Sequence, residues 1–139
     1  MCLFVLSDST LDFLNYSDGQ WFGCGEWIGH SQKVFEEAFL REGIEVVLET
    51  ACGTGFALRS WAGDRFGARM KRHREHFISK GKWRPYDGVL ILGGYNDAVP
   101  KNRSRYSLPL SEALNETLIE CYAFVEKPPR SAQQLPLEF

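Results

Sequence analysis

The sequence predicts an α/β fold in which a parallel sheet carries helices on its faces. Three short apolar runs, at residues 2–6, 44–49 and 88–92, alternate with segments whose apolar residues recur at helical spacing. This order is typical of a parallel sheet whose strands are joined by right-handed crossovers. Successive side chains of a strand point to opposite faces of the sheet, and these runs are apolar at consecutive positions. We therefore expect both faces of the sheet to be covered.

The first strand ends abruptly at Ser7-Asp8-Ser9-Thr10, and small polar residues after an apolar run favour a sharp turn. A loop rich in Gly, Asp and aromatic residues follows at 13–25 and is expected to lie over the site. Residues 26–42 predict a helix that ends before Gly43. Its inward side chains are expected to be Trp27, Val34, Phe35 and Ala38.

The second strand, at 44–49, leads into the glycine turn Ala51-Cys52-Gly53-Thr54-Gly55. Asp64 is suited to cap a second helix that runs to residue 80 and stops at Gly81. The inward stripe of this helix is expected to be Phe66, Met70, His73 and Phe77. Its basic residues are expected to form a solvated face: Arg65, Arg69, Lys71, Arg72 and Arg74.

The third strand, at 88–92, ends in Gly93-Gly94-Tyr95-Asn96-Asp97, and a polar, basic loop continues to Ser107. A last helix is expected at 111–126. Its inward stripe is predicted to be Leu114, Leu118, Cys121, Tyr122 and Val125. The 139 residues suit one domain, which we place at 1–127, with a loose, proline-containing tail at 128–139.

Charge and cysteine usage exclude several classes of function. The formal net charge of −2 gives no strong steering of nucleic acid or of an anionic membrane. Cys2, Cys24, Cys52 and Cys121 form no C-x-x-C pair, so we expect no zinc site and a reduced, cytoplasmic setting. No run reaches the length of a membrane span, and no basic region precedes the first apolar run.

The three turns that follow the strands contain the candidate site residues. Turns at the carboxyl ends of parallel strands meet at one edge of the sheet, and neighbouring strands lie about 4.8 Å apart. Ser9 would supply a hydroxyl, Gly53 a backbone N–H without an obstructing side chain, and Asn96 an amide N–H. A hydroxyl facing such donors is the arrangement that acyl transfer requires, a nucleophile beside an oxyanion hole.

These turns, with the run from Pro85 to Asp97, resemble the motifs of the SGNH (GDSL-type) hydrolases. The resemblance implies a flavodoxin-like three-layer α/β/α fold and hydrolysis of a small ester, with no metal or organic cofactor. It implies that Ser9 is the nucleophile and that Gly53 and Asn96 form the oxyanion hole. It gives Asp8 and Asp97 positioning roles.

The chain departs from the family pattern in one important respect. The family base lies in a C-terminal Asp-x-x-His motif, which this sequence does not contain. His30, His73 and His76 all precede Asn96; we expect His73 in the core, His76 in solvent or at an interface and His30 to be structural. The base is therefore unknown, and the domain resembles the first two-thirds of the family fold. Such a domain would leave the third strand as an exposed edge prone to self-association.

Two other classes of function stay open. The same fold without a base would be a non-catalytic ligand-binding remnant. Residues 47–55 also resemble the glycine-rich motif of S-adenosylmethionine-dependent methyltransferases. A complete strand and turn precede that motif, however, and the interval from Gly55 to Tyr86 holds only one helix, so we favour the hydrolase.

Overall fold

Three parallel strands form the main sheet of the computed structural model, which describes residues 1–8, 16–17, 20–21 and 30–126. The strand order is β4 (Glu45–Thr50), β1 (Cys2–Ser7), β5 (Gly88–Leu92), so the first strand lies in the middle. Val5 is in register with Leu48 on one side and Leu90 on the other. The predicted α/β class with a parallel sheet is confirmed.

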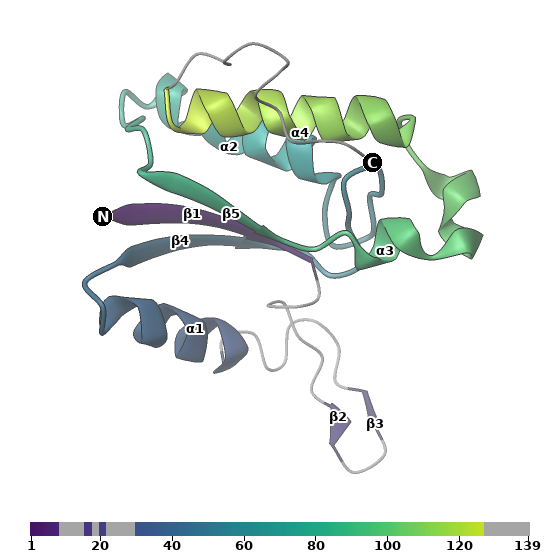
Figure 1. Cartoon of the computed structure of the whole chain (residues 1–139), viewed down its shortest axis with the longest axis horizontal. Coiled ribbons are helices and arrows are strands. Elements are labelled where there is room, and N and C mark those ends of the chain that lie inside the picture. The colour runs from purple at the N-terminus through teal and green to yellow at the C-terminus, as the bar shows by residue number, and fades with distance from the viewer. Residues whose placement is uncertain (9–15, 18–19, 22–29, 127–139) are drawn as a thin grey trace.

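Helices lie on the two sides of this sheet (Figure 1). Helix α1 (His30–Leu40) lies on one side, and α2 (Phe66–Ser79) and α4 (Leu110–Phe124) lie together on the other. The fully buried core lies between the sheet and the α2–α4 pair: Phe4, Leu6, Phe66, Met70 and Phe124. The predicted inward positions of Phe66 and Met70 are therefore confirmed.

The predicted inward face of α1 is partly wrong. Phe35 and Phe39 are half-buried with ring centroids 4.8 Å apart, whereas Val34 is 54% exposed and Ala38 is exposed. Residues four apart share a helix face, and the Phe35–Phe39 pair is the face that this helix buries. Trp27 and the predicted first turn of the helix lie outside the described residues.

Within the predicted loop 13–25, β2 (Tyr16–Ser17) and β3 (Gln20–Trp21) pair antiparallel.

The predicted inward stripe of α4 is displaced by one position. The buried residues are Ala113, Thr117, Glu120 and Phe124, each adjacent in sequence to a predicted one. Leu114, Leu118, Cys121, Tyr122 and Val125 are only half-buried. The displacement arises because α4 packs chiefly against α2, so the face turned to that helix is the buried one.

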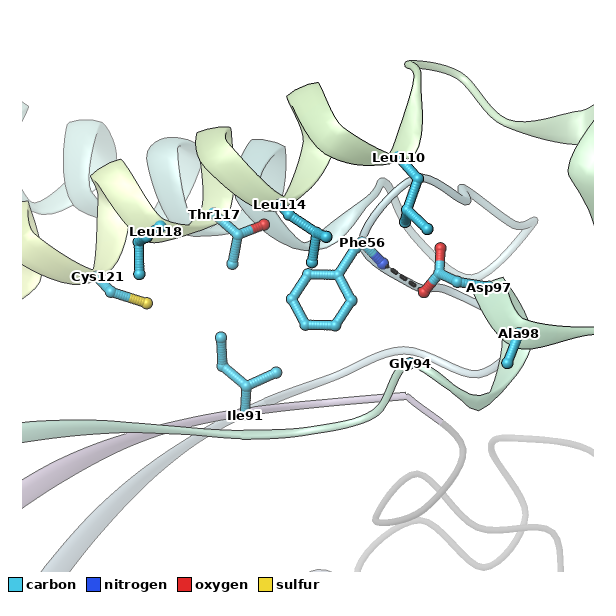
Figure 2. A pocket seen from close by; sticks show the side chains of 10 residues that line it. All are labelled: Phe56, Ile91, Gly94, Asp97, Ala98, Leu110, Leu114, Thr117, Leu118 and Cys121. Atoms are coloured by element: carbon cyan, nitrogen blue, oxygen red, sulfur yellow. Dashed lines mark hydrogen bonds between the residues drawn. The ribbon is translucent and has the colours of Figure 1, made fainter. Parts of the chain in front are cut away.

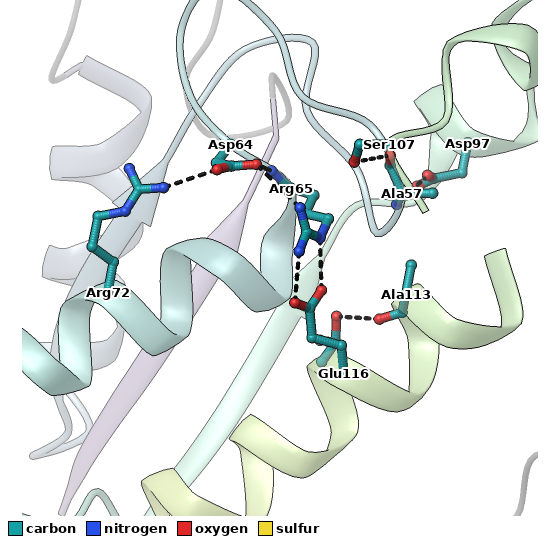
Figure 3. Close-up of polar contacts among 9 residues, drawn as sticks. Ala57, Asp64, Arg65, Arg72, Asp97, Ser107, Ala113 and Glu116 are labelled. Atoms are coloured by element: carbon teal, nitrogen blue, oxygen red, sulfur yellow. Dashed lines mark hydrogen bonds and ion pairs between the residues drawn. The ribbon is translucent and has the colours of Figure 1, made fainter. Parts of the chain in front are cut away.

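The predicted solvated face of α2 is only partly confirmed: Lys71 and Arg72 are exposed, whereas Arg65, Arg69 and Arg74 are not. The guanidinium of Arg65 donates to both carboxylate oxygens of Glu116 on α4, at 2.8 and 2.9 Å (Figure 3). Arg74 makes the same two-pronged contact with Glu120, at 3.0 and 3.1 Å. Two charge-assisted pairs therefore join the helices, and hydrogen bonding to the carboxylates raises the pKa of both arginines.

The start of α2 also differs from the prediction. Arg65, not Asp64, is the residue before the helix, and Asp64 makes no capping bond to its first turn. Instead, Asp64 accepts a hydrogen bond from the Arg65 N–H at 2.8 Å and contacts Arg72 at 2.9 Å (Figure 3).

No helix in the described part of the chain has the length and apolarity needed to cross a bilayer.

Candidate functional site

The candidate site lies where the three strands of the main sheet end. The Ser7 carbonyl accepts a hydrogen bond from Ala51 N–H at 3.1 Å, and Asp8 N–H donates to the Leu92 carbonyl at 3.4 Å. These bonds fix the end of β1 between the turns that follow β4 and β5. Ser9, the predicted nucleophile, is the next residue along the chain and lies outside the described residues.

Gly53 holds a backbone conformation that suits glycine alone. Its φ is +75°, in the left-handed region, and a Cβ added to it would lie 3.2 Å from the Ser60 Cβ. Within the described part of the chain, the Gly53 N–H donates no hydrogen bond. An uncommitted backbone donor at a strand end is what an oxyanion hole uses.

Asn96 lies in a short helix, α3 (Tyr95–Ala98), in place of the predicted open turn. Gly94 precedes the helix with φ +103°, which turns the chain sharply after β5. The Asn96 Nδ2 donates to the Thr54 carbonyl at 2.9 Å, and Asn102 Nδ2 donates to the Asn96 carbonyl at 2.9 Å. The structure thus brings Asn96 against the loop that carries Gly53, as the sequence predicts, and no described residue accepts the second N–H of its amide.

Asp97 joins the same two turns from their buried side. Its carboxylate accepts a hydrogen bond from Phe56 N–H at 2.8 Å (Figure 2) and another from Ala57 N–H at 2.9 Å. Its carbonyl accepts a bond from the Tyr106 hydroxyl. The side chain is 5% exposed, so Asp97 positions the loop after β4 and points away from solvent.

Asp8 is 1% exposed, and its carboxylate lies beside the turn after β5. A Cβ added to Gly93 would come within 3.1 Å of the Asp8 Oδ2. Asp8 therefore belongs to the packing beneath the site.

Arg69 is a site residue that the sequence interpretation missed. Its side chain is 4% exposed and donates to the Ser7 carbonyl at 3.2 Å, the Glu49 carbonyl at 2.9 Å and the Thr54 Oγ1 at 2.8 Å. It thus joins the ends of β1 and β4 directly beneath Gly53 and Asn96. One signal was present in the sequence, because Arg69 is three residues after Phe66 and four before His73, on the inward face of α2.

A polar pocket of about 490 Å³ opens beside Gly53 and Asn96. The other described residues that line it come from the loop after β4, from α3, from a 3₁₀ helix, η1 (Pro100–Arg105), and from the residue between these two helices. They are Ser60, Trp61, Tyr95, Val99, Lys101, Asn102 and Arg105. Hence the two residues that were predicted to form the oxyanion hole line a space large enough for a small-molecule substrate.

A second pocket, apolar and about 360 Å³, lies between β5 and α4 (Figure 2). Ile91 enters it from the strand, and Leu114, Leu118 and Cys121 enter it from the helix. Burial raises the pKa of the Cys121 thiol to about 11, so the thiol is neutral at ordinary pH. This pocket is separate from the polar one and does not contain Gly53 or Asn96.

The described histidine side chains lie away from the polar pocket. His73 contacts the Tyr86 hydroxyl at 3.0 Å and packs 4.9 Å from the Phe4 ring, which confirms its predicted place in the core. Desolvation by burial lowers the pKa of His73. His76 is exposed on α2. Among the described residues that line the pocket, no histidine or carboxylate is present.

Comparison of the chain with protein-family models, with curated proteins and with solved structures gave no match. Its function is therefore argued from the site itself.

Proposed function

We propose that the chain is an SGNH-type serine esterase domain of flavodoxin-like three-layer architecture, or an incomplete copy of one. The proposal rests on the proximity of Gly53 and Asn96. Asn96 Nδ2 donates to the carbonyl of Thr54, the residue after Gly53, while the Gly53 N–H donates to no described residue. Two donors therefore lie together beside the strand end that leads into Ser9.

The strand order supports the architectural part of the proposal. The order β4-β1-β5 places the second strand of the main sheet, then the first, then the third, which begins the flavodoxin-like order. Helices lie on both sides of the sheet (Figure 1). In this arrangement, ligands bind at the carboxyl ends of the strands, which is where the polar pocket opens.

In the proposed reaction, the Ser9 hydroxyl attacks the carbonyl carbon of an ester. The N–H groups of Ser9 and Gly53 and the Asn96 amide stabilise the negative charge that develops on the carbonyl oxygen. The alcohol then leaves, and water hydrolyses the acyl-serine to regenerate Ser9 and release a carboxylic acid. A base must take the Ser9 proton, and none of the described residues that line the pocket supplies one.

The ligand-binding remnant is the second candidate, and the composition of the pocket favours it. A serine without a base is a weak nucleophile, whereas the donors of Gly53 and Asn96 would still bind a carbonyl or carboxylate. The methyltransferase has less support, because the glycine turn follows β4, an edge strand among the described strands, and Asp97 fills the space beside Gly55.

The test of the esterase is covalent labelling of the full chain with a fluorophosphonate, together with hydrolysis of para-nitrophenyl acetate. We expect the label on the peptide that contains Ser9 and its loss in Ser9→Ala. Ser60→Ala is the matched control, because Ser60 lines the same pocket but donates its hydroxyl hydrogen to the Cys52 carbonyl at 2.5 Å. Labelling of Ser60, or equal hydrolysis by Ser9→Ala, would reject Ser9 as the nucleophile. A wild-type chain that is neither labelled nor hydrolytic would contradict the esterase and leave the remnant.

A further inference from the structure

We infer that the ligand of the polar pocket is a small ring compound that carries an anionic group, and that the esterase substrate is therefore an ester of this kind. The substrate part of the inference rests on the proposed function. The binding part rests on the pocket alone, on its two cations and its two exposed aromatic rings.

The first observation is an unbalanced positive charge at the pocket. Lys101 and Arg105 line it, four residues apart on η1, and neither forms an ion pair with a described carboxylate. No described lining residue is acidic. The adjacent acid, Asp97, is turned to the backbone N–H groups of Phe56 and Ala57. Because the whole chain has a net charge of −2, this positive field is local to the pocket.

The second observation is a pair of aromatic side chains that stay exposed at the pocket. Trp61 is 79% exposed and Tyr95 is 77% exposed. They belong to different turns, one after β4 and one after β5. Large rings with free faces at a small-molecule pocket bind other rings by stacking and apolar contact.

The turn that carries Trp61 is fixed although its side chain is exposed. Ser60 N–H donates to the Gly63 carbonyl at 2.8 Å, and Ala62 N–H donates to the Ser60 Oγ at 3.0 Å. The Ser60 hydroxyl is in turn bonded to the Cys52 carbonyl, next to Gly53. The backbone that carries the indole is thus held at a set position relative to Gly53, which lowers the part of the ordering cost that comes from the loop when a ring binds there.

The test uses two pairs of compounds that share a ring and differ in charge and in one methyl group, and hydrolysis is followed as release of the phenol. For hydrolysis these are para-acetoxybenzoate and its neutral methyl ester, and for binding they are the products para-hydroxybenzoate and its methyl ester. We expect the wild-type chain to prefer the anionic member by up to about fivefold for each cation, and the preference to fall at roughly 0.5 M salt.

Lys101→Gln with Arg105→Gln should remove most of this preference, measured as the ratio of the anionic to the neutral compound in each variant. Arg103→Gln is the matched control, since Arg103 is an exposed cation on the same 3₁₀ helix but does not line the pocket. Equal binding of both members of a pair by wild type, or an equal loss in Arg103→Gln, overturns the inference. If calorimetry shows that the chain binds the anionic product more tightly but neither ester is hydrolysed, the binding site is supported and the esterase is rejected.

Discussion

The carboxylate of Asp97 occupies the space that a side chain on Gly55 would take. A Cβ built on Gly55 would overlap Asp97 Oδ2, and that same oxygen accepts the Phe56 N–H at 2.8 Å. The turn after β5 is therefore inserted into the loop after β4. This contact, rather than the sheet alone, keeps Asn96 beside Gly53.

The first prediction concerns this contact. Gly55→Ala should lower the free energy of unfolding by about 1–3 kcal/mol, since the methyl group must displace a buried carboxylate. Asp97→Asn should cost about 1–3 kcal/mol, because an amide N–H₂ then faces a backbone N–H. Urea denaturation measures both, with Glu42→Gln, at an exposed carboxylate, as the control.

A double-mutant cycle distinguishes a direct interaction between Gly55 and Asp97 from two independent losses of stability. Asp97→Ala removes the carboxylate, so Gly55→Ala should be much less costly in that background. Additive losses would show that the two residues do not interact and that Asn96 is held in some other way.

The second prediction concerns Arg69. Arg69→Met leaves the Ser7 and Glu49 carbonyls without its N–H groups and should cost at least about 2 kcal/mol. Arg72→Met on the same helix should cost less than about 1 kcal/mol, because the Arg72 side chain is 68% exposed. Arg69→Lys should fall between them, since one ammonium does not reach all the acceptors. Equal losses for Arg69→Met and Arg72→Met in denaturation would refute this role.

Arg69 also shows how far sequence reasoning could go. The strands were predictable to within about a residue, because each is an apolar run that ends at glycine or small polar residues. The proximity of Gly53 and Asn96 followed from the parallel sheet, whose strand ends share an edge. A buried arginine could not be predicted in this way, because its partners are backbone carbonyls that only the folded strand ends bring together.

The buried faces of the helices were less predictable for a related reason. α4 carries apolar side chains on two faces, and Ala113, Thr117 and Phe124 are buried while Leu114 and Leu118 line a pocket. Which face is buried depends on the helix packed against it, and the acidic residues that meet Arg65 and Arg74 decide that here. The catalytic roles of Ser9, Gly53, Asn96, Asp8 and Asp97 stay predictions, and covalent labelling of Ser9 tests the first of them.

The third prediction is a pH dependence of stability that arises from His73. Burial lowers the pKa of His73 from its ordinary value of 6.5, so the unfolded chain binds the proton more readily than the folded chain. This contribution to the free energy of unfolding should be complete above pH 6.5 and fall as the pH drops toward the folded pKa. His73→Gln should flatten that part of the profile. His76→Gln, exposed on the same helix, should change it much less, because the His76 charge is a smaller cause of the lowered His73 pKa than burial is. If both variants kept the wild-type pH profile of the free energy of unfolding, the proposed contribution of His73 would be contradicted.

The last prediction concerns the free edge of β5, for which we propose self-association with a second copy of the chain. Among the described strands, β5 pairs only with β1, and its open side adjoins the apolar pocket that Leu118 lines. An unpaired edge beside an apolar surface tends to pair with another chain.

We expect sedimentation velocity to show a concentration-dependent dimer that Leu118→Glu dissociates. Ile119→Glu is the matched control, because the adjacent Ile119 is 56% exposed and outside the pocket. Both variants should first be shown to keep the wild-type circular dichroism, so that loss of the dimer is separated from loss of the fold. A chain that stays monomeric at every concentration, or a dimer that Ile119→Glu disrupts as strongly as Leu118→Glu, would reject this surface as the interface.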